Sequence, residues 1–154
     1  MCSSDLVNAV AAYDRTRTAT IVVDFGTATT FDCITADGHF LGGVIMPGIR
    51  TASDALIRGT AKLPATDLMP PARTIGRRTD EAIRSGVLLG TADAVDGIVR
   101  RIKAEWPNGT TPQVIATGGL AGLVAPLVRE IESVHPDLTL TGLRIAAKAL
   151  GLTW

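Results

Sequence analysis

Three segments near the start of the chain carry the apolar patterns of β-strands. Thr20–Val23 is an unbroken run of β-branched and apolar residues, which predicts a buried strand. Thr29–Thr35 alternates in the manner of a second strand, and Phe40–Met46 has the composition of a third. The Asp37-Gly38 pair between them is typical of a hairpin turn. We therefore predict three consecutive antiparallel strands ahead of any long helix.

Helical patterns flank these strands. Before them we predict a helix that is capped by Ser3 or Ser4 and has one apolar face. That face comprises Leu6, Val7, Val10 and Ala11. After them, Pro47 is suited to the first turn of a helix that runs toward Arg58. The proline-rich segment Gly59–Arg78 shows no sustained period and is predicted to be a long loop, a kind of segment that is often functional.

The clearest helix start in the chain is Thr79-Asp80-Glu81. Thr79 has the side chain of an N-cap residue, and acidic side chains in the first turn are favoured by the helix dipole. Apolar residues then recur near helical spacing as far as Ile102. We expect this helix to be the longest of the chain and to end near Trp106.

Shorter elements alternate in the last third of the chain. Val114–Ala116 is predicted to be a buried strand, and Leu120–Ser133 a helix that Pro126 kinks or breaks. Leu138–Leu140 is predicted to be a last strand and Leu143–Leu150 a last helix. The resulting order, βββ-α-α-β-α-β-α, indicates an α/β domain in which helices pack on a mixed sheet.

Composition narrows the class of protein. The chain has 154 residues, of which 46% are hydrophobic and 19% charged, so it can bury a core and is not of the disordered class. Fifteen basic residues balance fifteen acidic ones, which argues against a nucleic-acid or membrane partner. No apolar run is long enough to span a bilayer, and no basic residue precedes Arg15 as a secretory signal requires. Cys2 and Cys33 form no paired motif. A cytoplasmic protein is expected.

The first candidate for chemistry is the pattern Asp24-x-Gly26-Thr27 at the end of the first strand. Its carboxylate can hold a cation, its glycine lets backbone N–H groups approach a phosphate, and its hydroxyl can donate to that phosphate. The alternative interpretation is a plain hairpin in which Asp24 caps the turn. Four residues alone do not decide between these interpretations.

Two further glycine clusters lie where strands begin or end. Gly118 and Gly119 follow a predicted strand and precede a predicted helix, which suits close contact with a flat or anionic ligand. A purely structural turn explains this pair equally well. The other cluster, Gly42-Gly43-x-x-x-Pro47-Gly48, lies at the end of the third strand, where glycines often mark close approach of another backbone or of a ligand. The chain has neither a P-loop nor the glycine fingerprint of a dinucleotide-binding domain.

A basic pair, Arg77-Arg78, precedes the Thr79 helix. Two guanidinium groups at a helix start could bind an anion. We favour a solvated pair that is balanced by Asp80 and Glu81, because exposed charges usually contribute little. Thr79 could cap the helix and still offer its hydroxyl to a ligand.

In combination, these segments closely resemble the type III pantothenate kinases. The similarity extends over residues 6–154, and the joint occurrence of its motifs is highly specific. The matching segments, in order, are Ile21–Asp32, Gly42–Gly48, Ala61–Pro64, Ile75–Gly86, Ala116–Ala121 and Asp137–Leu143.

The resemblance implies a function and a fold. Type III pantothenate kinases phosphorylate pantothenate with ATP to give 4′-phosphopantothenate, the first step of coenzyme A biosynthesis. They have the acetate-and-sugar-kinase/actin (ribonuclease H-like) fold with two similar lobes. They are homodimers that require a monovalent cation, potassium or ammonium, and magnesium is expected to accompany ATP.

The resemblance also implies roles for individual residues. Asp24 is expected to bind the monovalent cation, and Thr79 to contact pantothenate near the dimer interface. The residues expected to bind ATP are Gly26, Thr27, Gly118 and Gly119, the last two beside the adenosine.

The sequence departs from the family pattern at its start. Family members have an Asp-x-Gly-Asn-Thr phosphate loop, and this sequence contains none. They also have a Gly-x-Asp-Arg segment whose Asp takes the proton of the pantothenate hydroxyl. An ungapped alignment places Ser4 at that Asp, and Asp5 reaches it only after a one-residue shift. A serine is not a base at neutral pH without activation, so no catalytic residue is assigned.

Two hypotheses about function follow. We expect residues 1–5 to be a foreign or junction segment and residues 6–154 to be the carboxy-terminal lobe of a bilobal kinase. This lobe is expected to show little turnover alone, because phosphoryl transfer needs both phosphate loops and the base. The alternative is a non-catalytic nucleotide-binding or dimerisation module, similar to the transcription accessory factors among the family's relatives. Another kinase of the superfamily, such as a sugar kinase, matches fewer of the motifs.

Overall fold

The computed structural model describes residues 3–60 and 63–152, and within them it forms a sheet with helices on both faces. The strands are β1 (Thr20–Phe25), β2 (Ala28–Ile34), β3 (Phe40–Pro47), β4 (Gln113–Thr117) and β5 (Ser133–Val134). The α-helices are α1 (Ser3–Thr16), α2 (Ile49–Arg58), α3 (Thr79–Glu105), α4 (Ala121–Val124) and α5 (Leu138–Ala149). Two single 3₁₀ turns, Pro107–Gly109 and Ala125–Leu127, complete the regular structure of this part of the chain.

The sheet is mixed, with the strand order β3-β2-β1-β4-β5. β1 pairs with β2 and β2 with β3 in antiparallel fashion, so the three consecutive antiparallel strands are confirmed. β4 adds to β1 in parallel, and β5 adds to β4 in parallel. The order places β1 at the centre of the sheet, and its carboxyl end lies beside that of β4.

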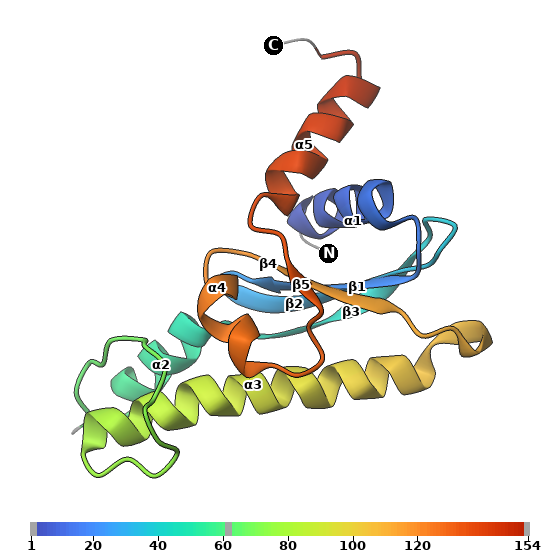
Figure 1. Ribbon diagram of the computed structural model, residues 1–154. Coiled ribbons are helices and arrows are strands. Elements are labelled where there is room, and N and C mark those ends of the chain that lie inside the picture. The colour runs from blue at the N-terminus through green and yellow to red at the C-terminus, as the bar shows by residue number, and fades with distance from the viewer. Residues whose placement is uncertain (1–2, 61–62, 153–154) are drawn as a thin grey trace.

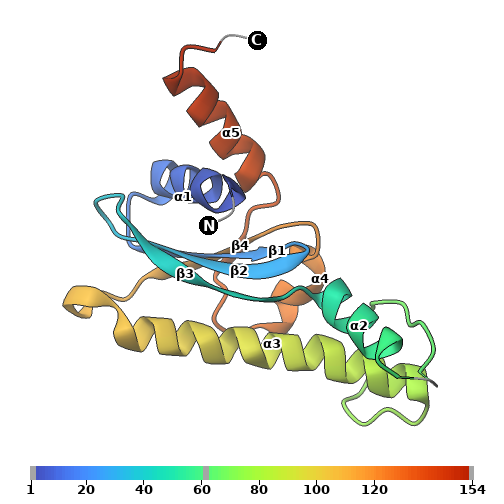
Figure 2. The same cartoon turned by 180° about the vertical axis from the view of Figure 1, so that it is seen from behind.

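Helices cover the two faces of the sheet separately. α1 and α5 lie on one face, and the long helix α3 crosses the other with α2 and α4 near its start (Figures 1 and 2). The larger core lies between the sheet and α3 and contains Phe25, Phe31, Leu88, Val95, Val99 and Val124 among others. The smaller core lies under α1 and contains Ala9, Ala12, Val22, Ile34, Ile115 and Leu138.

The first helix buries a different face from the one predicted. Leu6 and Val10 are 47% and 40% exposed. The buried side chains of the helix are Asp5, Asn8, Ala9, Ala11 and Ala12. Alanines let the helix lie close to the sheet, and the two polar side chains face the sheet beside Asp24 and Asp32. The apolar residues Leu6 and Val10 therefore do not mark the buried face of this helix.

The segment after β4 departs most from the sequence prediction. Instead of a helix over Leu120–Ser133, α4 lasts one turn, and the chain becomes extended after the 3₁₀ turn that contains Pro126. Asp96 on α3 accepts hydrogen bonds from the backbone N–H groups of Arg129 and Glu130, both at 2.9 Å. These bonds hold a bend at Arg129 and Glu130, from which the chain leads into β5.

The predicted last strand is wrong as well, because Leu138–Leu140 forms the first turn of α5. The strand of this region is β5, which pairs Ser133 with Ile115 and Val134 with Ala116. The order of elements nevertheless holds, since a short strand still precedes the last helix.

Element boundaries also differ at two helix starts. Pro47 ends β3 opposite Ala28, and α2 begins after Gly48. Thr79 is the first residue of α3, whose N-cap is Arg78 in extended conformation without a side-chain capping bond. The segment between these helices forms no helix or strand over 59–60 and 63–78, as predicted for a loop. α3 has 27 residues and ends at Glu105, which confirms the longest helix.

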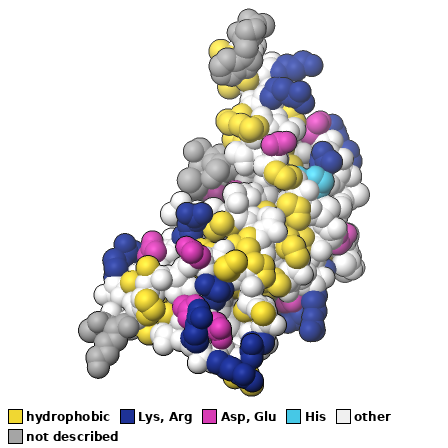
Figure 3. Space-filling model, turned by 60° about the vertical axis from the view of Figure 1, so that its left-hand side comes forward, with side chains coloured by type: hydrophobic (Ala, Val, Ile, Leu, Met, Phe, Trp, Pro, Cys, Tyr) yellow, Lys and Arg dark blue, Asp and Glu magenta, His cyan; other side chains and the backbone are white. Residues whose placement is uncertain are grey.

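The surface mixes apolar and charged side chains. In the space-filling view, hydrophobic side chains spread across the middle of one face, with Lys and Arg above and below them (Figure 3). The most exposed large hydrophobic side chains include Ile75, Leu140 and Ile45, which are 81%, 66% and 65% exposed. In the described part of the chain, no helix combines the length and hydrophobicity needed to cross a bilayer.

α1 and α5 cross at a point of backbone contact. A Cβ atom on Gly142 of α5 would lie only 2.0 Å from the carbonyl oxygen of Val7 on α1. No side chain larger than hydrogen fits there unless the helices separate. Gly142 thus sets the distance between the first and last helices.

We expect Gly142→Ala to destabilise the fold by roughly 1–3 kcal/mol, because the added methyl group must push α5 away from α1. Urea unfolding followed by circular dichroism measures this loss. The matched control is Gly90→Ala on α3, where an added Cβ meets nothing within 4 Å. That change is expected to be neutral or stabilising by up to about 1 kcal/mol, since alanine favours helix. Equal stability of the two variants would contradict the prediction.

Candidate nucleotide and cation site

The turn that follows β1 carries the first candidate pattern. Asp24 is the penultimate residue of β1, and Gly26 and Thr27 form the turn into β2. The N–H of Gly26 donates to the carbonyl of Ala28 (3.0 Å), which closes the turn. The hydroxyl of Thr51 on α2 donates to the carbonyl of Thr27 (2.8 Å). The Thr27 side chain is exposed, so its hydroxyl can meet a ligand.

The second glycine turn packs directly against the first. Gly118 has φ +95°, a conformation that strongly favours glycine. A Cβ atom at this position would lie 2.4 Å from Oδ1 of Asp24 and 2.7 Å from the backbone nitrogen of Phe25. The N–H of Leu120 donates to the Phe25 carbonyl (3.3 Å). The parallel pairing of β1 and β4 thus brings the two turns together.

A cavity of about 460 Å³ lies between these turns and α2. Its lining includes Gly26, Thr27, Gly119, Arg50 and Asp54. Three of the four residues expected to bind ATP therefore share one cavity, and the fourth, Gly118, lies beneath it against Asp24. An adjoining cavity of about 420 Å³, lined by Leu68, Leu120, Leu123 and other residues, continues toward loop 65–68 and shares Arg50 and Asp54 with the first.

The environment of Asp24 includes two residues that the sequence did not point to. The side-chain amide of Asn8 on α1 donates to Oδ2 of Asp24 (2.9 Å). The hydroxyl of Thr139 on α5 donates to Oδ1 of Asn8 (2.7 Å). Burial raises the pKa of Asp24 above its ordinary value, the Asn8 hydrogen bond opposes this rise, and the charge of Asp5 adds to it. The sequence signal that could have pointed to Asn8 is its position as a polar residue inside an otherwise apolar helical stretch.

A second carboxyl group, Asp32 on β2, lies on the same face of the sheet. It is 3% exposed, and no hydrogen-bond partner for its Oδ2 atom is found among the described residues. Burial, with the nearby charges of Asp5 and Asp24, raises the pKa of Asp32 to about 7. Asp5 and Asp32 line a cavity of about 280 Å³ together with Gly42 and Gly43. The glycine pair of β3 thus borders a pocket of acidic character.

The donor set at Asp24 limits which ions it suits. Among residues 3–60 and 63–152, no group of three His, Cys, Asp or Glu side chains is arranged to hold a metal ion. Asp24 offers one partly exposed carboxylate, and its Oδ1 atom lies against the Gly118 turn. Divalent cations take several oxygen ligands, so this single carboxylate fits a weakly bound monovalent cation better than a divalent one. Ser4 lies in α1, but its side chain is outside the described residues.

The structure does not bring Thr79 into these cavities. Thr79 is exposed at the first residue of α3 and lines neither the cavity at Gly26 and Thr27 nor the adjoining one. Within this chain, the residue expected to bind pantothenate is therefore separate from the residues expected to bind ATP.

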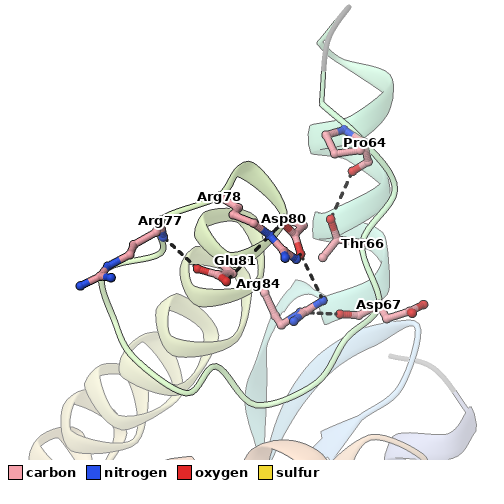
Figure 4. Close-up of polar contacts among 8 residues, drawn as sticks. All are labelled: Pro64, Thr66, Asp67, Arg77, Arg78, Asp80, Glu81 and Arg84. Carbon is pink, nitrogen blue, oxygen red and sulfur yellow. Dashed lines mark hydrogen bonds and ion pairs between the residues drawn. The ribbon is translucent and has the colours of Figure 1, made fainter.

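Charged side chains around Thr79 are paired with one another (Figure 4). The Arg78 guanidinium contacts Asp80, with Nη2–Oδ2 at 2.6 Å, and lies 3.9 Å from Glu81. The hydrogen bond from Arg78 holds the pKa of Asp80 below its ordinary value. The preference for a balanced pair is thereby confirmed for Arg78. The Arg77 side chain points away from this cluster, while its backbone N–H donates to Glu81 (2.9 Å).

Comparison with known proteins identifies the family. The sequence model that describes type III pantothenate kinases matches residues 4–101. The chain belongs to the type III pantothenate kinase family. Among individual relatives, the type III pantothenate kinase of Desulfatibacillum aliphaticivorans is 55% identical over 141 residues, which cover 91% of this chain and 54% of that protein.

Other family members give the same result. The enzymes of Thermomicrobium roseum and Anaeromyxobacter sp. (strain K) are 52% and 51% identical, over 92% and 91% of this chain. Each match covers 54% of the relative. The chain therefore spans about half the length of the curated type III pantothenate kinases that it matches.

Solved structures confirm the fold class. The activator of 2-hydroxyisocaproyl-CoA dehydratase from Clostridium difficile superposes with a TM-score of 0.56 at 17% identity, over 97% of this chain and 69% of that one. Component A of (R)-2-hydroxyglutaryl-CoA dehydratase from Acidaminococcus fermentans gives 0.54 at 17% identity, over 92% and 64%. The α/β fold is that of the acetate-and-sugar-kinase/actin class, as the resemblance implied.

Asp32 makes the stability of the protein depend on pH. Its pKa is 3.8 as an ordinary carboxyl and about 7 in the fold. Between these values the folded protein binds more protons than the unfolded chain, so stability falls as pH rises through this window. We expect the melting temperature to be several degrees lower at pH 8 than at pH 5. Asp32→Asn should shrink that difference and raise the melting temperature at pH 8.

Calorimetry at the two pH values tests this expectation. Asp93→Asn, an exposed position on α3, is the control and should keep the difference seen in the unaltered protein. If Asp32→Asn melts no higher than the unaltered protein at pH 8, Asp32 is not the group responsible.

Proposed function

We propose that the protein functions in the ATP-dependent phosphorylation of pantothenate to 4′-phosphopantothenate. Membership of the type III pantothenate kinase family supports this function. The observation that carries it is the single cavity in which the turn at Gly26 and Thr27 meets the turn at Gly119. A cytoplasmic location belongs to the same proposal, because it suits an enzyme with soluble metabolites as substrates.

The residues of the cavity divide the binding of ATP between them. The Thr27 hydroxyl is exposed beside the turn and donates to a phosphate oxygen. Gly118 and Gly119 lie on the adenosine side: Gly119 lines the cavity without a side chain and leaves room for a flat ligand, and Gly118 lets the turn pack against Asp24. Gly26 completes the phosphate turn. Because phosphoryl transfer depends on positioning and on charge neutralisation, these contacts hold the nucleotide in line for attack.

Asp24 is the residue proposed to hold the monovalent cation, potassium or ammonium. Such a cation supplies positive charge near the phosphates when it is bound. The carboxylate is fixed by Asn8 at Oδ2 and by the Gly118 turn beside Oδ1. Magnesium is proposed to arrive with ATP, since the described residues present no divalent site of their own.

The pantothenate end of the reaction is proposed to need a second copy of the chain. Thr79 is exposed and outside the cavity of its own chain, so a homodimer in which it reaches the partner's pantothenate fits its position. At the base position, Ser4 lacks a carboxylate, and Asp5 is buried in the first turn of α1. We propose that the 154 residues alone bind ATP but transfer phosphate slowly or not at all.

Two measurements on the purified protein test the proposal. Calorimetric titration with ATP in potassium buffer should show binding. An assay with ATP, magnesium and pantothenate should release ADP far more slowly than the Desulfatibacillum aliphaticivorans enzyme assayed in parallel. Absence of ATP binding would contradict the nucleotide role. ADP release at the rate of that relative would contradict the impaired turnover.

A non-catalytic nucleotide-binding or dimerisation module remains the alternative. The observation that favours it is a cavity between the two glycine turns in a chain whose sequence has Ser4, and no carboxylate, at the base position. Titration with pantothenate separates the two functions. A kinase lobe responds to pantothenate by a change in ATP affinity, whereas a module binds ATP with no response to pantothenate.

Thr27→Val is expected to weaken ATP binding roughly tenfold, because it removes one hydrogen bond to an anionic group, worth about 1.4 kcal/mol. The isosteric change should leave the melting temperature nearly unchanged, since the side chain is exposed. Thr110→Val, at an exposed loop position outside the cavity, is the control and should bind ATP normally. Equal affinities of the two variants would refute the role of the Thr27 hydroxyl.

A further inference from the structure

We infer that Asn8 and Thr139 are positioning residues that together orient the carboxylate of Asp24 for its cation. The inference rests on the proposed function, since it presumes that Asp24 holds the monovalent cation. It adds two residues, from the first and the last helix, that act on the site through Asp24.

The contacts form a directed chain of hydrogen bonds. The Thr139 hydroxyl donates to the Asn8 Oδ1 atom at 2.7 Å, and the Asn8 amide nitrogen donates to Asp24 Oδ2 at 2.9 Å. Asn8 is fully buried, so water does not compete for its amide. The two hydrogen bonds therefore run in one direction, from Thr139 to Asn8 and from Asn8 to Asp24.

Asp24 and Thr139 together fix which way the Asn8 amide faces. A carboxamide has a donor end and an acceptor end of nearly equal shape, and only its partners distinguish them. An ionised carboxylate only accepts, so Asp24 selects the NH₂ end of the amide, and the Thr139 hydroxyl, which can donate or accept, donates to the oxygen end. Reversal of the amide would set its oxygen against the carboxylate oxygen. Asp24 thus excludes the reversed amide, and the Thr139 hydroxyl holds the oxygen end of the amide in place.

The Asn8 contact in turn fixes Asp24 from one side. With Oδ2 bound to Asn8, Oδ1 lies against the Gly118 turn, where no Cβ atom would fit. The carboxylate plane is thereby set between α1 and the turn that borders the nucleotide cavity. Without the Asn8 donor the carboxylate can rotate away from that turn. We therefore assign Asn8 and Thr139 to cation binding as well as to stability.

The two helices hold this chain of contacts in place. Gly142 lies one turn beyond Thr139 on α5, and Val7 precedes Asn8 on α1. The backbones touch at Gly142 and Val7, where a Cβ atom would lie 2.0 Å from the carbonyl oxygen. The close crossing leaves Thr139 within reach of Asn8. The geometry is therefore built into the helix pair and does not depend on a mobile loop.

The test compares the potassium dependence of ATP binding in matched variants. Thr139→Val keeps the shape and removes the hydroxyl, Thr139→Ser keeps the hydroxyl, and Thr141→Val alters a neighbouring threonine of α5. ATP affinity is measured by calorimetry over a potassium series at constant ionic strength. Loss of a group that orients a metal ligand typically weakens metal binding 10-fold to 100-fold. We expect Thr139→Val to raise the half-saturating potassium concentration roughly tenfold.

The controls separate positioning from stability. Thr139→Ser and Thr141→Val should keep the potassium dependence of the unaltered protein to within roughly twofold, a shift small beside the tenfold one. Melting temperatures are measured in parallel, and Thr139→Ala replaces Thr139→Val if the valine variant does not fold. A lower melting temperature with unchanged potassium dependence would overturn the inference and leave a structural role. If the unaltered protein binds ATP without any effect of potassium, both the cation role of Asp24 and the inference fail. If it does not bind ATP at all, the proposed function fails with them.

Discussion

The burial of a carboxylate at the end of the central strand is the constraint on which the site depends. β1 is covered on both faces and flanked on both edges, so much of the Asp24 carboxylate is shielded from water. A charged group in such a place must find donors or lose its charge. The donor here is the Asn8 amide, which α1 places beside Asp24, and the small turn at Gly118 lies against the other carboxylate oxygen. Packing and chemistry are therefore joined at one residue.

The parts of the site that were predictable from sequence are local in the chain. The turn at Gly26 and Thr27 follows a run of β-branched residues, and the turn at Gly118 and Gly119 follows another. The parallel pairing of β1 with β4 then joins them. The support of Asp24 by Asn8 was not predictable, because it crosses from a helix to a strand and no periodicity reports such a pair.

The fold was predictable where the sequence of a single element determines its type and its ends. The three antiparallel strands and α3 have strong periodicity and clear ends. The region after β4 has neither. There Asp96, more than 30 residues away in sequence, accepts hydrogen bonds from two backbone N–H groups at a bend, and this tertiary contact overrides helix propensity. The prediction of the buried face of α1 was wrong for the same reason. Tertiary contacts bury its polar side chains Asp5 and Asn8 against the sheet and leave Leu6 and Val10 exposed.

The contact between Thr139 and Asn8 joins residues 131 positions apart. Closing so long a loop costs more chain entropy than any pairing within the hairpins, so this contact has little to gain early in folding. The orientation of Asp24 by Asn8 is therefore complete only when α5 docks against α1. The geometry of a carboxylate on the central strand thus depends on the last helix of the fold.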